Sequence, residues 1–325
     1  MSEAIQHLVG HDEAMEVVQA AFASGRMHHA WLMTGIEGIG KATLAKHIAQ
    51  FVLANGQGKL GKMDPEHRVA KLVDAETHPD MLIIRRPTDE KTGEQRNIIP
   101  VEEAQRIATF LHKTATHGGW RIVLIDEAHT LNRNGQNAIL KIIEEPPPKT
   151  LILITVTTPG VLLPTIRSRC RLLPLAPLDV IHMRAVLQRT AHQASPDDIN
   201  TLIALSGGSI GFALKILNSE ALPLYREMLA ILDAMPQMDV ARVHKLADQI
   251  ARKADAESFD VLTSLLIERF RTLAQSEAVR HPQGDVGLAL QLWDKTRATF
   301  SAADHGNLDR KLAFINAMSD IRAAI

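Results

Sequence analysis

Short apolar runs alternate with amphipathic stretches along the first half of the chain. Four of the runs have the length of buried strands, at residues 30–34, 81–84, 122–125 and 151–156. The stretches before and between them predict helices at residues 12–24, at 42–53, from Pro100 onward and at 138–143. Strands that are apolar throughout and are separated by helices are typical of a parallel sheet covered on both faces. We therefore expect an α/β domain in this half.

The strand signals stop after Leu175. Residues 177 to about 217 predict short helices around a turn at 206–208, and residues 218–325 are helical in pattern, with breaks near Pro236 and at His281-Pro282. This organisation predicts three domains, at residues 1–175, 176–217 and 218–325. Two polar stretches are predicted to be mobile insertions, at residues 56–76 and 85–96.

Composition narrows the classes of function. The 36 Lys and Arg and 37 Asp and Glu residues give a formal net charge of −1 over 325 residues, so bulk charge alone is not expected to hold nucleic acid. The single cysteine, Cys170, excludes an internal disulfide and a zinc site with several thiolates, and the 15 histidines show no metal-ligand spacing. No apolar run approaches about 18 residues, and the N-terminus lacks a signal-peptide pattern. We expect a cytoplasmic protein without a membrane span or a metal site.

Residues 35–42 carry the first chemical signal. Their sequence, Gly-Ile-Glu-Gly-Ile-Gly-Lys-Ala, fits the phosphate loop G-x-x-x-x-G-K and lies between a predicted strand and a predicted helix. Glycines let backbone N–H groups converge on a phosphate, the helix N-terminus attracts it, and Lys41 adds a positive charge. Ala42 stands where a Ser or Thr normally ligates Mg²⁺, and Thr43 lies one residue too late to replace it. A glycine-rich turn that binds nothing is the alternative.

The second signal is a pair of carboxylates at the end of the strand 122–125. Asp126 is placed to hold Mg²⁺ through water and Glu127 to polarise an attacking water, because ligands of open α/β sheets bind at the carboxyl ends of strands. A strand-to-helix turn capped by Asp126 is the structural alternative. Asp126-Glu127-Ala128-His129 also spells a helicase motif, but such helicases need a second sheet domain, and the second half of this chain is helical in pattern.

The third signal is a cluster of arginines around the lone cysteine, at residues 167–171. An arginine at a subunit edge can stabilise the γ-phosphate of a neighbour's nucleotide. Surface arginines in ordinary ion pairs are the alternative, which the spacing by itself favours. No base accompanies Cys170, so we expect it to be a small buried residue rather than a nucleophile.

The order of these motifs resembles the AAA+ clamp-loader family of bacterial DNA polymerase III. The motifs are the phosphate loop, Asp126-Glu127, the stretch 137–141, Glu144-Glu145-Pro146-Pro147, the strand end Thr157-Thr158 and Ser168-Arg169-Cys170. The resemblance covers about residues 1–217 by motif, and the rest by its helical character alone. It implies an AAA+ (RecA-like) parallel-sheet domain, a small helical lid and an all-α C-terminal collar that holds the subunit in a ring.

The resemblance also implies roles for individual residues. Asp126 and Glu127 match the Walker B motif, and Thr157 matches the first sensor, which reads the γ-phosphate. Arg169 matches the arginine finger that acts on the ATP of a neighbouring subunit. A degenerate Walker A loop is implied for Gly35, Gly38, Gly40, Lys41, Ala42 and Thr43.

Three departures from the family pattern shape the functional hypothesis. Ala42 replaces the hydroxyl that binds Mg²⁺, Gly211 occupies the arginine position of the second sensor helix, and the polar stretch 56–76 stands in place of a four-cysteine zinc module. Since Arg169 is retained, the chain is expected to complete a neighbour's ATP site during loading of the sliding clamp. Its own ATPase or polymerase activity is expected to be small or absent, with ATP and Mg²⁺ held poorly and no zinc.

A competent ATPase subunit of the gamma/tau type is the second hypothesis, because Lys41, Asp126 and Glu127 are all present. A nucleotide-free interaction protein is the third. The implied partners are the delta and gamma/tau subunits of the ring and, through the ring, the sliding clamp and primed DNA. The three hypotheses differ in whether this chain binds and hydrolyses ATP.

Overall fold

The computed structural model describes residues 8–89, 93, 95–116, 119–219, 221–235, 237–251, 256–280, 287–306 and 309–324. The chain forms two compact units. One consists of Met1–His192 and Ser206–Gly211, and the other of Gln193–Leu205 and Phe212–Ile325. The predicted division into three domains stays a prediction.

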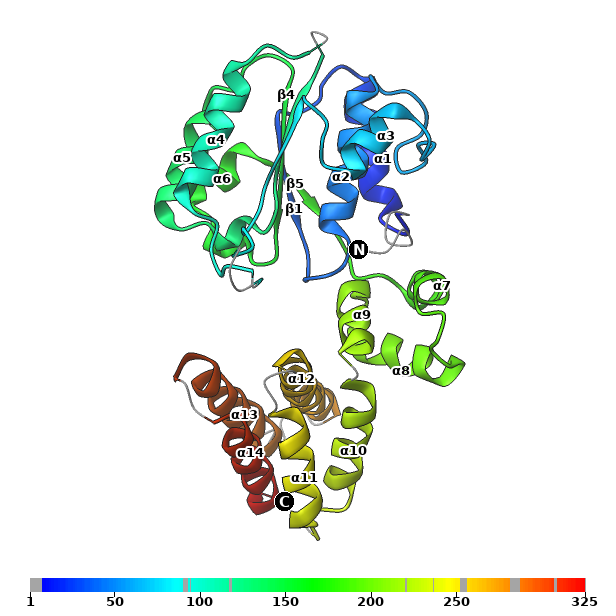
Figure 1. The fold of residues 1–325 in the computed structure, drawn as a ribbon, viewed down its shortest axis with the longest axis vertical. Helices are drawn as coiled ribbons and strands as arrows, with labels where there is room; N and C mark the ends of the chain where they lie inside the picture. Colours follow the sequence, from blue (N-terminus) through cyan, green and yellow to red (C-terminus); the bar gives the residue numbers. More distant parts are fainter. Residues whose placement is uncertain are drawn as a thin grey trace. The chain divides into compact units, whose positions relative to one another are not determined.

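A five-stranded parallel sheet lies in the first unit (Figure 1). Its strands are β1 (Ala30–Thr34), β2 (Met81–Ile84), β3 (Arg121–Ile125), β4 (Thr150–Val156) and β5 (Arg171–Pro174). They run in the order β2-β3-β4-β1-β5, and every neighbouring pair is parallel. The parallel sheet and the four predicted strands are confirmed. The strand β5 was not predicted, because only Leu173 of its four residues is buried and the edge strand carries no apolar run.

Helices cover both faces of this sheet, as a parallel sheet requires. Figure 1 shows α1 (Asp12–Ala23), α2 (Lys41–Leu53) and α3 (Arg68–Asp74) on one face, and α4 (Val101–His112), α5 (Arg133–Glu144) and α6 (Pro164–Arg169) on the other. Strand side chains alternate between the two layers: Trp31 and Met33 pack in the core beside α1 and α2, and Leu32 packs in the core beside α4 and α5. This arrangement brings the carboxyl ends of β1, β3 and β4 to one edge of the sheet.

The polar stretch 56–76 is an ordered part of the first unit, so the prediction of a mobile insertion was wrong there. Leu60 is 1% exposed in the sheet core, and its N–H donates to Oε1 of Gln19 over 3.3 Å. Residues 68–74 form α3, whose Val73 is buried. The three buried apolar residues of the stretch, Leu60, Ala70 and Val73, lie among many charged ones and are too few to give a periodic signal. In the stretch 85–96, residues 90–92 and 94 lie outside the described residues.

The predicted helical character after Leu175 is confirmed for the residues that the structure describes. The shorter helices are α7 (Val180–Thr190), α8 (Pro196–Ser206) and α9 (Ile210–Asn218), and the later ones are α10 (Ala221–Asp233), α11 (Val240–Ile250), α12 (Ala256–Arg280), α13 (Gly287–Gly306) and α14 (Arg310–Ala324). The breaks predicted at Pro236 and His281-Pro282 lie outside the described residues. Within the second unit, α13 packs against α12 and α14, and α11 packs against α14.

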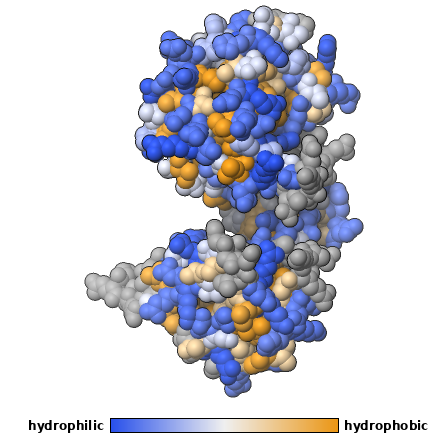
Figure 2. Space-filling model, turned by 60° about the vertical axis from the view of Figure 1, so that its left-hand side comes forward, coloured by the Kyte–Doolittle hydropathy of each residue, from blue (hydrophilic) through white to orange (hydrophobic). Residues whose placement is uncertain are grey.

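The surface of the sheet-containing unit carries both polar and apolar residues. On the face of the sheet-containing unit seen in Figure 2, apolar residues form small spots between polar ones. Across the described part of the chain, none of the helices is both long enough and apolar enough to span a bilayer.

Candidate nucleotide site

The loop between β1 and α2 has the glycine-dependent geometry that a phosphate loop needs. Gly35, Gly38 and Gly40 have φ values of +152°, +76° and +101°, which L side chains rarely adopt. At Gly35 a Cβ atom would also lie only 2.7 Å from the carbonyl oxygen of Leu175. The predicted strand–loop–helix context is therefore present, and only glycine fits at its first position.

Lys41 is buried against the loop that it follows. Its side chain is 8% exposed, and Nζ donates to the carbonyl oxygens of Gly35 (2.9 Å) and Ile36 (2.7 Å). Burial lowers the pKa of Lys41, and the nearby Asp126 carboxylate acts in the opposite direction. Ala42 and Thr43 are partly buried in the first turn of α2, where Ala42 offers no oxygen to a metal ion.

Three further residues, from two other segments, bind the carbonyl groups of the same loop. Nε2 of His11 donates to Ile39 O (2.8 Å), Oγ of Ser209 donates to Glu37 O (2.7 Å), and the N–H of Gly211 donates to Gly38 O (2.8 Å). Together with Lys41, they engage every carbonyl group from residue 35 to residue 39. Burial lowers the pKa of His11, so its ring is neutral at physiological pH and donates from Nε2.

Gly211 packs directly on the phosphate loop. A Cβ atom at Gly211 would lie 2.8 Å from Cα of Gly38 and 3.2 Å from its carbonyl oxygen. Gly211 and the loop belong to the same compact unit. The position at which the resemblance expects an arginine therefore has no room for a side chain.

The two carboxylates that match the Walker B motif, Asp126 and Glu127, face different partners. Asp126 follows β3 directly, and its N–H continues the parallel pairing by donating to Ile84 O (2.8 Å). The hydroxyl of Thr155, on β4, donates to Oδ1 of Asp126 (2.5 Å) and accepts the N–H of Glu127 (2.9 Å). Burial raises the pKa of Asp126, an effect that the hydrogen bond from Thr155 opposes. The Asp126 carboxylate is thus held by its own sheet.

Glu127 is bound by a cation that the sequence did not point to. Its backbone is left-handed, with φ of +56°, and its Oε2 accepts a hydrogen bond from Nε of Arg86 over 2.7 Å. Arg86 lies two residues after β2, which pairs with β3, the strand that Asp126 follows. The ion pair engages Oε2, one of the two carboxylate oxygens of Glu127.

Thr157 and Arg169, the other predicted site residues, lie at the sheet edge and at the end of α6. Thr157 directly follows β4, at the same sheet edge as Asp126, and is partly buried. Arg169 is the last residue of α6, and its side chain is 41% exposed. Cys170 packs against the core beside α4 and α5, and burial raises the pKa of its thiol to about 12. Cys170 is therefore protonated at neutral pH and is not a nucleophile.

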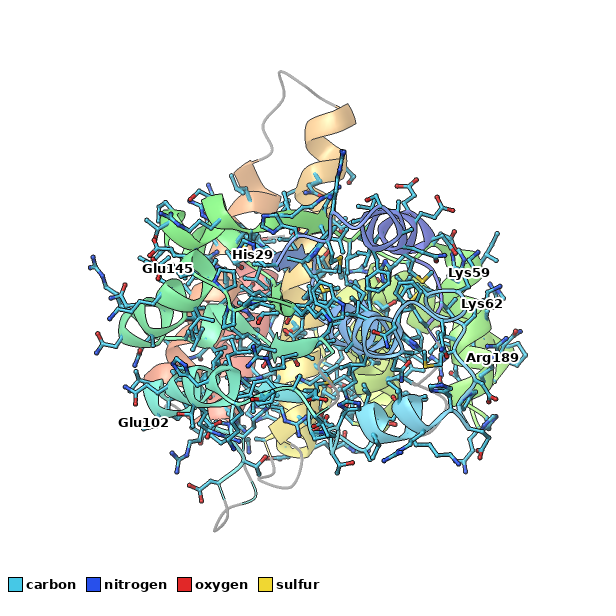
Figure 3. The ribbon with its side chains drawn as sticks, turned by 90° about the horizontal axis from the view of Figure 1, so that it is seen from above. His29, Lys59, Lys62, Glu102, Glu145 and Arg189 are labelled. Carbon is cyan, nitrogen blue, oxygen red and sulfur yellow. The ribbon has the colours of Figure 1, made fainter. Side chains whose placement is uncertain are left out.

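Charged residues of the first unit lie on opposite sides of the sheet. Figure 3 shows Glu102 and Glu145 on the side of α4 and α5, and Lys59, Lys62 and Arg189 on the other.

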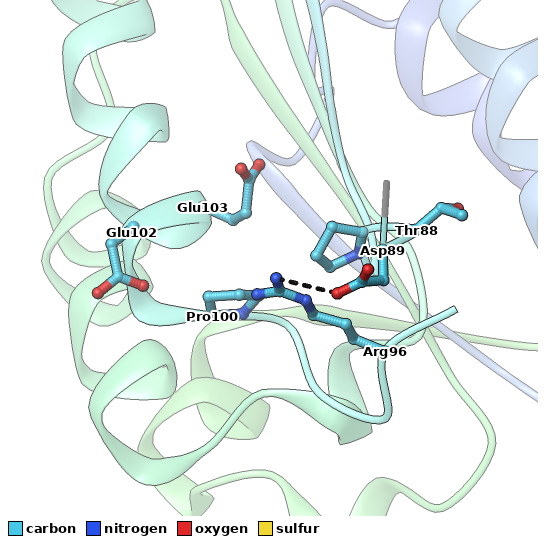
Figure 4. Close-up of a pocket in the computed structure, with 7 residues that line it drawn as sticks. Thr88, Asp89, Arg96, Pro100, Glu102 and Glu103 are labelled. Carbon is cyan, nitrogen blue, oxygen red and sulfur yellow. Dashed lines mark ion pairs between the residues drawn. The ribbon is translucent and has the colours of Figure 1, made fainter. Parts of the chain in front are cut away.

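A separate pocket of about 580 Å³ lies beside the start of α4, where Nη2 of Arg96 is 3.6 Å from Oδ2 of Asp89 (Figure 4). None of the predicted site residues lines that pocket.

The buried Asp126 gives the protein a predictable pH dependence. Because its pKa is raised on folding, its cost to stability is absent below the ordinary Asp pKa of about 3.9 and grows as the pH rises through the folded-state pKa. Asp126→Asn is therefore expected to raise the free energy of unfolding at pH 7, with a smaller gain at pH 4.5. Urea denaturation at both pH values measures it.

Thr155→Val is the paired variant, for which the free energy of unfolding is expected to change in the opposite direction. It removes the hydroxyl that favours the charged carboxylate, so it is expected to destabilise the protein by about 1–3 kcal/mol, more at pH 7 than at pH 4.5. Equal or lower stability of Asp126→Asn at pH 7 would contradict this account of the site.

The fold and the site define a class of protein: a P-loop α/β protein of AAA+ type with a parallel sheet and a helical remainder. The model of the family described as DNA polymerase III, delta subunit, matches residues 10–179, which is just over half of the chain. The chain belongs to this family. The resemblance read from its motifs is thereby confirmed.

Curated relatives carry names from the same polymerase. The chain is 37% identical to DNA polymerase III subunit delta' of Pseudomonas aeruginosa over 185 residues, or 56% of this chain and 53% of that protein. It is 32% identical to the Escherichia coli subunit of the same name over 206 residues, covering 63% and 59%. A gamma/tau subunit of Mycobacterium tuberculosis is 27% identical over 307 residues, covering 84% of this chain and 49% of the relative. The chain thus spans about half the length of the relatives that it matches.

Proposed function

We propose that this chain is a delta-prime-like subunit of the DNA polymerase III clamp loader. In this role it binds no productive ATP of its own and supplies Arg169 to the ATP site of a neighbouring subunit. Its partners are the delta and gamma/tau subunits, and the assembled ring opens the sliding clamp and loads it on primed DNA. Two relatives bear the delta' name, and the neutral net charge suits a chain whose contacts are mainly with proteins.

The contact of Gly211 with Gly38 is the observation that carries the proposal. An efficient ATPase site needs cationic groups on the γ-phosphate and a correctly placed Mg²⁺. Here the lid residue touches the loop backbone, so no cationic side chain can enter from position 211. The metal ligand that a Ser or Thr at position 42 would supply is also missing, because Ala42 has no side-chain oxygen. We therefore derive no hydrolytic step in this site.

Arg169 has the exposure that action on a neighbour requires. In ATP hydrolysis, water attacks the γ-phosphorus, the bond to the β–γ bridging oxygen breaks, and ADP leaves with the electron pair while a proton is released. Negative charge on the transferring group is stabilised by an arginine finger. Arg169 ends a short helix at the surface of the first unit, whereas Lys41 is buried in its own loop.

A competent ATPase of the gamma/tau type is the second candidate function. It is favoured by the presence of Lys41, Asp126 and Glu127 and by the long match to a gamma/tau relative. It requires a cationic contact to the γ-phosphate that position 211 does not supply. Nucleotide binding separates the two candidates.

Binding of ATP to the purified chain is expected to be weak and independent of Mg²⁺. With no metal-ligating hydroxyl at position 42, adding Mg²⁺ should change the Kd for labelled ATP by less than about twofold. Isothermal titration with and without Mg²⁺ measures it, and Ala42→Ser serves as the variant in which a hydroxyl is restored. Binding that Mg²⁺ strengthens tenfold or more, together with ATP turnover by the isolated chain, would favour the gamma/tau type instead.

A further inference from the structure

The Arg169 guanidinium is held by two acceptors of its own chain. Nη2 lies 3.0 Å from Oε1 of Glu144, and Nη1 donates to the carbonyl oxygen of Thr165 over 3.2 Å. Glu144 is the last residue of α5 and Arg169 the last residue of α6, so the pair joins the ends of two helices that pack against each other. Of the five N–H groups of an arginine, these contacts use two and leave three for a further anion.

The position of Glu144 is unusual for a carboxylate. The C-terminal end of a helix carries partial negative charge and favours Lys, Arg or His over Glu. Glu144 breaks this rule in the last turn of α5, where Lys141 supplies one positive charge and the ion pair with Arg169 adds another. Residues that break a local rule and are compensated elsewhere are concentrated at functional sites.

The backbone beneath the pair is fixed. Ile143, which precedes Glu144, is 1% exposed, and Ile166 of α6 is fully buried. Nε2 of His29 donates to the carbonyl oxygen of Ile143 over 2.9 Å and so occupies an end carbonyl of α5. Cys170, next to Arg169, packs in the same core. Both partners therefore stand on rigid elements, although their side chains are 38% and 41% exposed.

We propose that Glu144 is a positioning residue for Arg169. Together with the Thr165 carbonyl it fixes the guanidinium plane, so that the remaining N–H groups meet the γ-phosphate of the neighbouring subunit's ATP. This rests on the proposed function, in which Arg169 acts in trans. The pair is half exposed and single, so its effect is expected to be a modest pre-organisation, about two- to fivefold in rate.

The test is a double-mutant cycle in the ring reconstituted from full-length subunits. Glu144→Ala is expected to lower the kcat of DNA-stimulated ATP hydrolysis about two- to fivefold without changing KM, because a finger contributes in the transition state. Glu144→Gln, which keeps the oxygen acceptor, is expected to lose less. In the Arg169→Ala background, Glu144→Ala should have no further effect.

Glu145→Ala is the matched control, because Glu145 is the exposed neighbour in the same motif (Figure 3). Gel filtration confirms that each variant enters the ring. An unchanged or increased rate in Glu144→Ala, or an equal loss with and without Arg169, would overturn the positioning role. If Arg169→Ala itself leaves the rate unchanged, the proposed function fails; if only the Glu144 effects are missing, this inference fails alone.

Discussion

Replacing Arg169 by Ala is expected to reduce ATP hydrolysis at the adjacent site of the ring by on the order of 10³-fold, or about 4 kcal/mol of transition-state stabilisation. The side chain is exposed at the end of α6 and contributes to no core, so the variant should fold and assemble normally. The rate is measured in the reconstituted ring with primed DNA and clamp, with the other ATP sites of the ring blocked.

Arg167→Ala is the control for this experiment. Arg167 lies on the same short helix and is also exposed, but it is not the residue that matches the finger. Arg167→Ala should leave ATP turnover unchanged. A loss of turnover in this variant would indicate a general effect of removing one surface charge. Equal rates in the parent and Arg169→Ala rings would contradict a finger role for Arg169.

Adding a single methyl group at Gly211 is expected to destabilise the first unit by about 1–3 kcal/mol, the cost of overpacking a tight contact. Within a helix, Gly→Ala normally stabilises by about 0.5–1 kcal/mol, so propensity and packing predict opposite signs. The change is measured as a lower urea midpoint and as faster amide hydrogen exchange in residues 35–41, which Gly211 and Ser209 bind.

Gly160→Ala provides the comparison, because a Cβ atom there meets no atom within 4 Å and φ is not in the left-handed region. It should be close to neutral. If Gly211→Ala were as stable as the parent and its loop exchanged no faster, Gly211 would not pack tightly on the loop 35–41, and an ATPase site in this chain would be favoured.

Strand prediction succeeded where the run of apolar residues is continuous. The strands β1, β2, β3 and β4 are nearly uniform apolar runs because both of their faces are covered, and their bounds agree with the sequence to within one residue. The edge strand β5 carries exposed Arg171 and Leu172 and ends in Pro174, so its apolar signal is limited to one position. Likewise, α3 has only Ala70 and Val73 buried among charged neighbours.

Only those residues of the candidate site that belong to continuous sequence motifs could be predicted. Gly35, Lys41 and Asp126 follow from motif spacing, but Thr155 and Arg86 become partners through strand register. Since Ile125 pairs with Ile154, the next residues, Asp126 and Thr155, lie side by side. Since Ile84 pairs with Ile125, the chain after β2 passes beside Glu127. A threonine in an otherwise apolar strand was the one available signal.

The contact between Gly211 and the phosphate loop could not be derived from the sequence. Motif comparison places a glycine where an arginine is expected, but the absence of a side chain by itself indicates only a missing charge. Its packing against Gly38 depends on how the segment 206–211 folds back on the sheet unit. The same is true of His11, whose bond to Ile39 depends on its left-handed backbone.

The most direct test of the account compares Lys41→Met with Arg169→Ala in otherwise identical reconstituted rings. Lys41 binds this chain's own loop, and Arg169 is proposed to act on the neighbour's nucleotide. DNA-stimulated ATP turnover should therefore stay within about twofold for Lys41→Met and collapse at the adjacent site for Arg169→Ala. Gel filtration verifies that both rings are complete. A large loss in Lys41→Met with normal turnover in Arg169→Ala would contradict the account and identify this chain as an ATPase subunit.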